Sequence, residues 1–84
     1  WTYEMGHLII IYHGGGYMTH YGHNQNNLVS SLDVVKRGDV IGYVGNTGIS
    51  SGPHLHFEIW RNDSSIDPLI YFPNYLKKDL TFKN

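Results

Sequence analysis

The sequence predicts an all-β domain in which short antiparallel strands form one sheet. Runs of β-branched and aromatic residues recur along the 84 residues, and glycine-rich turns separate them. No stretch of ordinary helix length repeats its apolar residues at helical spacing. Five such runs can be counted, and short strands joined by turns in this way are typical of antiparallel hairpins.

The first two predicted strands form a hairpin. "HLIIIYH", His7 to His13, is rich in β-branched residues, and "GGG" at 14–16 supplies a turn before the second arm, Tyr17 to His23. Because side chains alternate between the two faces of a strand, His23 is expected at the end of this arm, on the same face as Tyr21.

The middle of the chain is less regular. After His23, amide residues are mixed with scattered apolar ones, which predicts a loop and then a short strand about Val34 and Val35. "KRGD" at 36–39 is interpreted as a turn. Strand character resumes from Val40 to Gly45, where two glycines suggest a bulge or a close backbone approach.

The last predicted strand is "HLHFEIW", His54 to Trp60. Alternation places Phe57 and its apolar neighbours on one face, and both histidines of this segment with Glu58 on the other. Beyond it the chain is expected to be irregular, except for one helical turn opened by Asp67-Pro68 and stopped by Pro73.

Composition and charge exclude several classes of function. Six Lys and Arg against seven Asp and Glu give a net charge of -1, so no basic field exists to bind a nucleic acid. The absence of cysteine excludes disulfides, cysteine zinc sites and thiol catalysis. No apolar run approaches the about 18 residues of a membrane span. A chain of 84 residues has a small core, so a metal or partner would add to its stability.

His54 and His56 are the strongest chemical signal. Residues two apart on a strand lie about 6.6 Å apart and point the same way, so both imidazoles can serve one site. One can bind a metal while its neighbour moves protons, because histidine titrates near neutral pH. A lone histidine on a strand face is more often a surface or hydrogen-bonded residue, and His7 and His20 are interpreted in this way.

Three segments together, "GGGYMTHYGH", "VVKRGDVIGYVG" and "GNTGISSGPHLHFEIW", are similar to the LytM/lysostaphin-type zinc metallopeptidases. These are envelope enzymes that cut peptide bridges of bacterial peptidoglycan. The match runs from about Trp1 to Leu76, in the family's order and spacing, and residues 77–84 are expected to be a tail. The resemblance implies the duplicated hybrid motif fold, an antiparallel sheet with a groove, here truncated at the amino-terminal side.

Two elements of the family pattern fit this chain. Thr-x-Tyr-x-His is matched by the segment ending at His23, and Gly-x-Thr-Gly-x-Ser-[Ser/Thr]-Gly-Pro-His-x-His-Phe is matched from Gly45 to Phe57. The resemblance implies that His56 is a zinc ligand, and that His54 and His23 are catalytic residues that activate water or stabilise the tetrahedral intermediate. It further implies a peptidoglycan peptide as substrate and a location in the cell envelope, periplasmic or extracellular.

One family element is missing. His-x-x-x-Asp supplies the other two zinc ligands in the family, and no histidine of this chain is followed by aspartate four residues later. The chain is therefore expected to be the carboxy-terminal part of a longer enzyme, or to receive these ligands from another chain. It is expected to bind zinc weakly, or not at all, by itself.

Two other functions stay open. One is a non-catalytic domain of the same fold that binds peptidoglycan or a wall hydrolase, and the other is a β-rich structural domain whose histidines are incidental. A degenerate relative tends to lose its remaining histidines too, and here His23, His54 and His56 are all present, which favours the enzyme.

Three further residues are assigned less specific roles. His13 either faces the substrate or forms a hydrogen bond within the hairpin, and Tyr21 either lines the groove or packs in the core. Glu58 is interpreted as an exposed strand carboxylate rather than as a support for the metal ligand.

Overall fold

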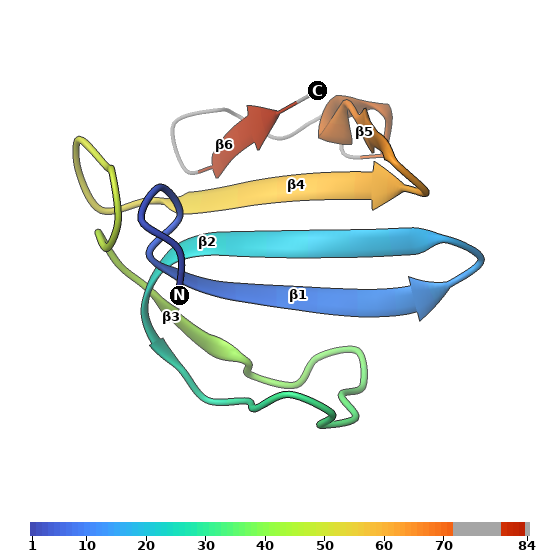
Figure 1. The fold of residues 1–84 in the computed structure, drawn as a ribbon, viewed down its shortest axis with the longest axis horizontal. Coiled ribbons are helices and arrows are strands. Elements are labelled where there is room, and N and C mark those ends of the chain that lie inside the picture. Colours follow the sequence, from blue (N-terminus) through green and yellow to red (C-terminus); the bar gives the residue numbers. More distant parts are fainter. Residues whose placement is uncertain (72–79, 84) are drawn as a thin grey trace.

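The computed structural model describes residues 1–71 and 80–83 and shows one mixed β-sheet (Figure 1). Its six strands are β1 (His7–Gly14), β2 (Tyr17–Asn27), β3 (Gly42–Val44), β4 (Leu55–Arg61), β5 (Ser64–Ile66) and β6 (Leu80–Lys83). One 3-10 turn, η1 (Pro68–Ile70), follows β5. The predicted all-β fold is confirmed.

β2 is the central strand of the sheet. It pairs with β1 on one side and β4 on the other, and its carboxyl end pairs with β3, all antiparallel. The outer edge of β4 pairs with β6 along its first half, in parallel, and with β5 along its second half, antiparallel. The sheet order is therefore β1-β2-β4-β5, with β3 and β6 off this path.

The predicted hairpin of β1 and β2 is confirmed. Ile9 pairs with Tyr21 and Ile11 with Thr19. The turn between the arms has positive φ angles at Gly14 (82°), Gly15 (62°) and Gly16 (81°), a conformation that glycine adopts without steric cost. The "GGG" run is therefore what allows the chain to reverse here.

The apolar core lies on one face of the three long strands. Ile9, Phe57 and Ile59 are buried, and Tyr21 packs its ring against Phe57 with centroids 5.3 Å apart. On the other face, His20 of β2 lies opposite Glu58 of β4, and Gly22 of β2 lies opposite His56 of β4. The predicted alternation of β4 is thus confirmed: the apolar residues face the core, and His56 and Glu58 face away from it.

The structure differs from the prediction in the middle of the chain. No strand forms at Val34 and Val35: among the described strands none pairs with this segment, and Val34 is exposed. β3 is limited to Gly42–Val44 within the expected Val40–Gly45. β2 continues past His23 to Asn27, since the amide side chains there bond the backbone: Asn27 Nδ2 donates to Leu8 O at 3.2 Å.

Two short strands form in the described part of the carboxyl-terminal region, where none was predicted. β5 and β6 both form where an irregular tail was expected. The helical turn at Asp67-Pro68 is confirmed as η1, because the Asp67 carboxylate accepts a hydrogen bond from Leu69 N at 2.9 Å. Pro73, expected to stop this turn, and the domain boundary at residue 76 lie outside the described residues.

Within the described ranges, no helix has the length and apolar character that crossing a membrane requires.

The N-terminal turn and the loop before β4 lie at the same end of the sheet (Figure 1). Thr2 and Gly6 form a bridge that closes the turn, and Ile49 N donates to Glu4 O at 3.0 Å across to the loop. These two segments border the space above the start of β4.

Candidate functional site

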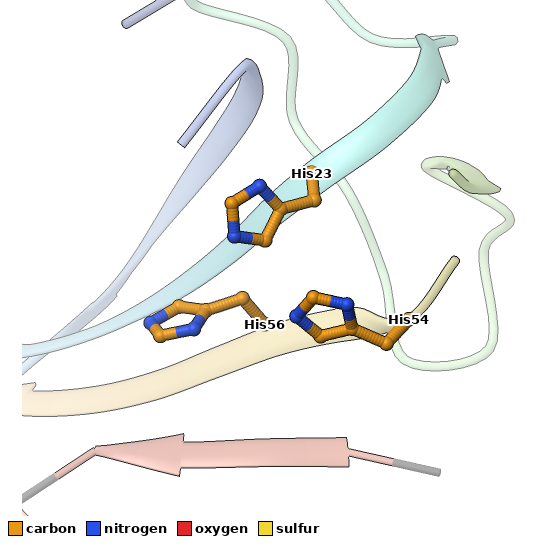
Figure 2. Close-up of side chains that lie close together, drawn as sticks. All are labelled: His23, His54 and His56. Carbon is orange, nitrogen blue, oxygen red and sulfur yellow. The ribbon is translucent and has the colours of Figure 1, made fainter. Parts of the chain in front are cut away.

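Three histidines that are distant in sequence converge at this end of the sheet. His23 comes from β2, His56 from the start of β4 and His54 from the residue just before β4, and one ligand nitrogen of each lies within 4.8 Å of the others (Figure 2). The His23 ring centroid is 4.9 Å from that of His54 and 5.6 Å from that of His56. Within the part of the chain that the structure describes, this is the one cluster of three potential metal ligands.

His23 reaches this cluster because β2 contains a bulge. Pairing passes from Ile9–Tyr21 to His7–Asn24, so Gly22 and His23 together oppose the single residue Leu8. His23 has a φ of 62°, in the left-handed region, and its backbone N–H donates to Met5 O at 2.6 Å. The bulge breaks the alternation of side chains and turns His23 toward the His56 face.

The expectation that His23 shares the face of Tyr21 is therefore wrong. Regular alternation placed it there, and the extra residue in the bulge reverses its direction. Tyr21 stays on the core face, where its hydroxyl accepts a hydrogen bond from Thr19 at 3.0 Å. His13 Nε2 lies 2.7 Å from that same Thr19 hydroxyl, which favours the hairpin role for His13 over a substrate-facing one.

The loop at residues 45–53 fixes two of the three imidazoles. Thr47 O accepts a hydrogen bond from His23 Nδ1 at 2.6 Å, and the Thr47 hydroxyl donates to Asn24 O at 2.6 Å and accepts from His7 N at 3.1 Å. Gly52 O accepts from His54 Nδ1 at 2.7 Å. The loop thus ties the bulge of β2 to the start of β4.

These acceptors assign the tautomer of each imidazole. A carbonyl oxygen only accepts hydrogen bonds, so Nδ1 of His23 and of His54 carries the hydrogen and Nε2 keeps the lone pair. His56 is the reverse case, because its Nε2 lies 2.6 Å from the Glu58 carboxylate and its Nδ1 keeps the lone pair. Each imidazole therefore retains one basic nitrogen.

Glu58 is buried, with 5% of its surface exposed, so its interpretation as an exposed carboxylate is wrong. β4 lies inside the sheet, and Trp60 covers the carboxylate and donates from Nε1 to Oε1 at 2.7 Å. Alternation already placed Glu58 on the face of His56. The missed signal was the hydrogen-bonding side chains of Trp60 and His20 on that same face.

His20 packs beside this carboxylate. Its ring stacks on Trp60 with centroids 5.8 Å apart, and Nδ1 lies 3.5 Å from Glu58 Oε1. Burial lowers the pKa of His20 below its ordinary value of 6.5; the Glu58 charge opposes this shift, and His56 adds to it. His7 lies outside the cluster and packs edge-on against Trp1, with centroids 4.8 Å apart.

A cavity of about 810 Å³ opens over the three histidines. Met5 and the loop residues from Ile49 to Pro53 line it, and so does Glu58, which contacts His56. A substrate segment entering this cavity would meet the basic nitrogens of the cluster. The floor thus combines a possible metal ligand with two groups able to move protons.

The donor set fits a zinc ion with one of the histidines as ligand. Metal-binding histidines usually donate their other N–H to a carboxylate or carbonyl, as His56 does to Glu58. Tetrahedral zinc holds nitrogens at about 2.0–2.1 Å, which sets pairs of ligands about 3.4 Å apart. The three ligand nitrogens lie within 4.8 Å of one another, close enough for His56 to bind an ion with the other two imidazoles beside it.

Comparison with known proteins gives a consistent family. Residues 1–68 match the family model described as Peptidase family M23. An uncharacterized metalloprotease of Buchnera aphidicola is 46% identical over 65 residues, 77% of this chain and 17% of the relative. The murein hydrolase activator NlpD of Escherichia coli is 46% identical over 68 residues, 81% of this chain and 18% of that protein.

A third relative is named as an enzyme. The peptidoglycan DD-endopeptidase ShyA of Vibrio cholerae is 48% identical over 54 residues, 64% of this chain and 13% of that protein. The chain spans less than a fifth of the length of each of these three relatives. The resemblance drawn from the motifs is confirmed, and with a match that covers residues 1–68 the chain belongs to Peptidase family M23.

Proposed function

We propose that this chain contributes His56 as a zinc ligand, and His23 and His54 as catalytic residues, to a zinc-dependent endopeptidase that cleaves peptide cross-bridges of peptidoglycan. The observation that supports this best is the convergence of the three imidazoles, with ligand nitrogens within 4.8 Å, in a member of a peptidase family. The tautomers are consistent with these roles, since Nδ1 of His56 and Nε2 of the other two remain basic.

When bound, zinc supplies Lewis-acid activation of water and of the peptide carbonyl. The histidines of the chain supply proton transfer. Nε2 of His23 or His54 takes a proton from the attacking water. While protonated, this ring donates a hydrogen bond to the developing oxyanion, and Thr47 O or Gly52 O holds its Nδ1–H and keeps its orientation. The proton then passes from Nε2 to the leaving amine, which restores the neutral ring.

The remaining zinc ligands are assigned to residues outside these 84. A catalytic zinc site has about three protein ligands, and the His-x-x-x-Asp element has no match in this sequence. The proposal therefore needs a further segment of the same polypeptide, or another chain. Residues 1–76 would be the carboxy-terminal part of the peptidase domain, with 77–84 as its tail.

The substrate and location rest on the relatives. One is named a peptidoglycan DD-endopeptidase and another a murein hydrolase activator, which supports action on peptidoglycan in the cell envelope. The identity with the activator also supports a second candidate, a non-catalytic domain that binds peptidoglycan or a wall hydrolase. The two candidates differ in one property: only the peptidase needs metal to act.

The test uses the protein encoded by the complete gene. Purified peptidoglycan is incubated with it, and released peptides and bound zinc are measured for the wild type, for His56→Ala and for His13→Ala as a matched control outside the cluster. The peptidase proposal expects cleavage and stoichiometric zinc, both lost only in His56→Ala. Absence of zinc and of cleavage, together with stimulation of a separate hydrolase, would leave the activator instead.

A further inference from the structure

We infer that Glu58, held by the indole of Trp60, is a positioning residue that keeps His56 in the one tautomer able to bind a metal through Nδ1. The inference builds on the proposed function, because it assumes that His56 binds metal. The family pattern matched above ends at Phe57, and the role follows from the contacts of these three side chains.

The contacts form a short chain on the face of β4 that points away from the core. Glu58 Oε2 lies 2.6 Å from His56 Nε2, and Glu58 Oε1 accepts from Trp60 Nε1 at 2.7 Å. The three residues alternate along one strand, so all three side chains project from the same face. The sequence spacing alone therefore brings them together once β4 forms.

The chemistry of these partners selects the tautomer. A neutral imidazole can carry its hydrogen on either nitrogen, whereas an ionised carboxylate only accepts. The short contact to Glu58 therefore favours hydrogen on Nε2 and leaves the Nδ1 lone pair for the metal. Hydrogen on Nδ1 would set two lone pairs against each other at the carboxylate and would block the metal.

The surroundings strengthen this selection. Only 6% of the Glu58 side chain is exposed, and His20 stacks over Trp60 beside it. Water is a weak competitor in such a site, and a hydrogen bond to a charged group gains strength there. Trp60 also orients the carboxylate, because an indole N–H can act only as a donor: it donates to Oε1, and Oε2 faces His56.

Glu58→Gln tests this arrangement because the amide has a single acceptor. The Trp60 N–H can be satisfied only by the amide oxygen, so the amide NH₂ faces His56 Nε2. His56 can accept a hydrogen bond from this NH₂ only if its Nε2 carries a lone pair. The ring hydrogen of His56 therefore moves to Nδ1. We expect this switch in the metal-free protein, together with a 10- to 100-fold loss of zinc affinity, the range typical of such outer partners.

Adding Trp60→Phe should rescue part of the defect. Without the indole donor, the amide of Glu58→Gln can turn its oxygen toward His56 Nε2 and its NH₂ toward His20 Nδ1, 3.5 Å from Oε1. The double variant should therefore regain the Nε2–H tautomer and bind zinc more tightly than Glu58→Gln alone. Simple damage to the fold would make the double variant worse than either single change.

The measurement is long-range ¹H–¹⁵N correlation of labelled histidine in the gene-encoded protein without metal, followed by zinc titration. Glu4→Gln is the matched control, because Glu4 lines the same cavity and its change removes the same charge. An Nδ1–H tautomer of His56 in the wild type, or no tautomer change in Glu58→Gln, would overturn the inference. A wild type that binds no zinc would overturn the proposed function, while the tautomer comparison would still decide the role of Glu58.

Discussion

Replacing Gly48 with alanine tests whether the loop at 45–53 is held against the N-terminal turn. Gly48 has a φ of 74°, and a Cβ there would lie 2.8 Å from Glu4 O and from Met5 C and would overlap Gly6 N. All three obstacles are backbone atoms, which cannot move independently. Left-handed strain costs about 1–2 kcal/mol for a residue with a Cβ. Forcing a methyl into a filled space adds about 1–3 kcal/mol.

Gly38→Ala separates these two costs. Gly38 has a φ of 91° and nothing within 4 Å of an added Cβ, so it carries the strain alone. A domain of this size loses roughly 4–8 °C in Tm for each kcal/mol. Thermal unfolding should therefore place Gly48→Ala at least about 4 °C below Gly38→Ala. Peptidoglycan cleavage should also fall more in Gly48→Ala, since the displaced loop carries Thr47 O away from His23.

Equal unfolding temperatures for the two variants would refute this reasoning. The result would mean that the loop does not press on Gly6 in solution, and that Thr47 does not hold His23 in the orientation described. A larger effect at Gly38, in an exposed turn, would refute it equally.

Two more predictions concern the same end of the sheet. Gly22→Ala should change the free energy of unfolding by less than about 1 kcal/mol, because the added Cβ meets mainly the flexible end of the Met5 side chain. Chemical denaturation measures this change. A loss of stability as large as that of Gly48→Ala would contradict the prediction. Burial lowers the pKa of His20 below 6.5, so the folded state binds a proton there less readily than the unfolded state does. The stability due to neutral His20 should be complete above pH 6.5 and decrease as the pH falls through the lower folded-state pKa. His20→Phe, which keeps a ring against Trp60, should reduce this loss in unfolding curves measured across that range, and an unchanged pH dependence would contradict the assignment.

The local sequence pattern was sufficient to predict the long strands. The β-branched run of β1, the glycine turn and the alternation of β4 predicted the hairpin, the core face of Phe57, and the common face of His56 and Glu58. Each of these features depends on residues that are neighbours in sequence. The placement of His54 and His56 at one site was likewise predicted from their spacing of two residues in the sequence.

Contacts between distant segments account for what the sequence did not reveal. The direction of His23 depends on a bulge whose hydrogen bonds come from Met5 and Thr47, and no period-two pattern encodes such a break. β6 pairs in parallel with β4, and its pairing cannot be recognised from the residues of β6 alone. Val34 is a residue type that favours strands, but none of the described strands pairs with it.

The role of His56 is tested most directly by locating the metal in the zinc-loaded, gene-encoded protein by anomalous diffraction at the zinc absorption edge. We expect one zinc ion about 2.0–2.1 Å from Nδ1 of His56, with Glu58 on Nε2 of the same ring and with His23 and His54 beside the ion but not bound to it. Zinc bound through Nε2 of His56, or bound away from this cluster, would contradict it.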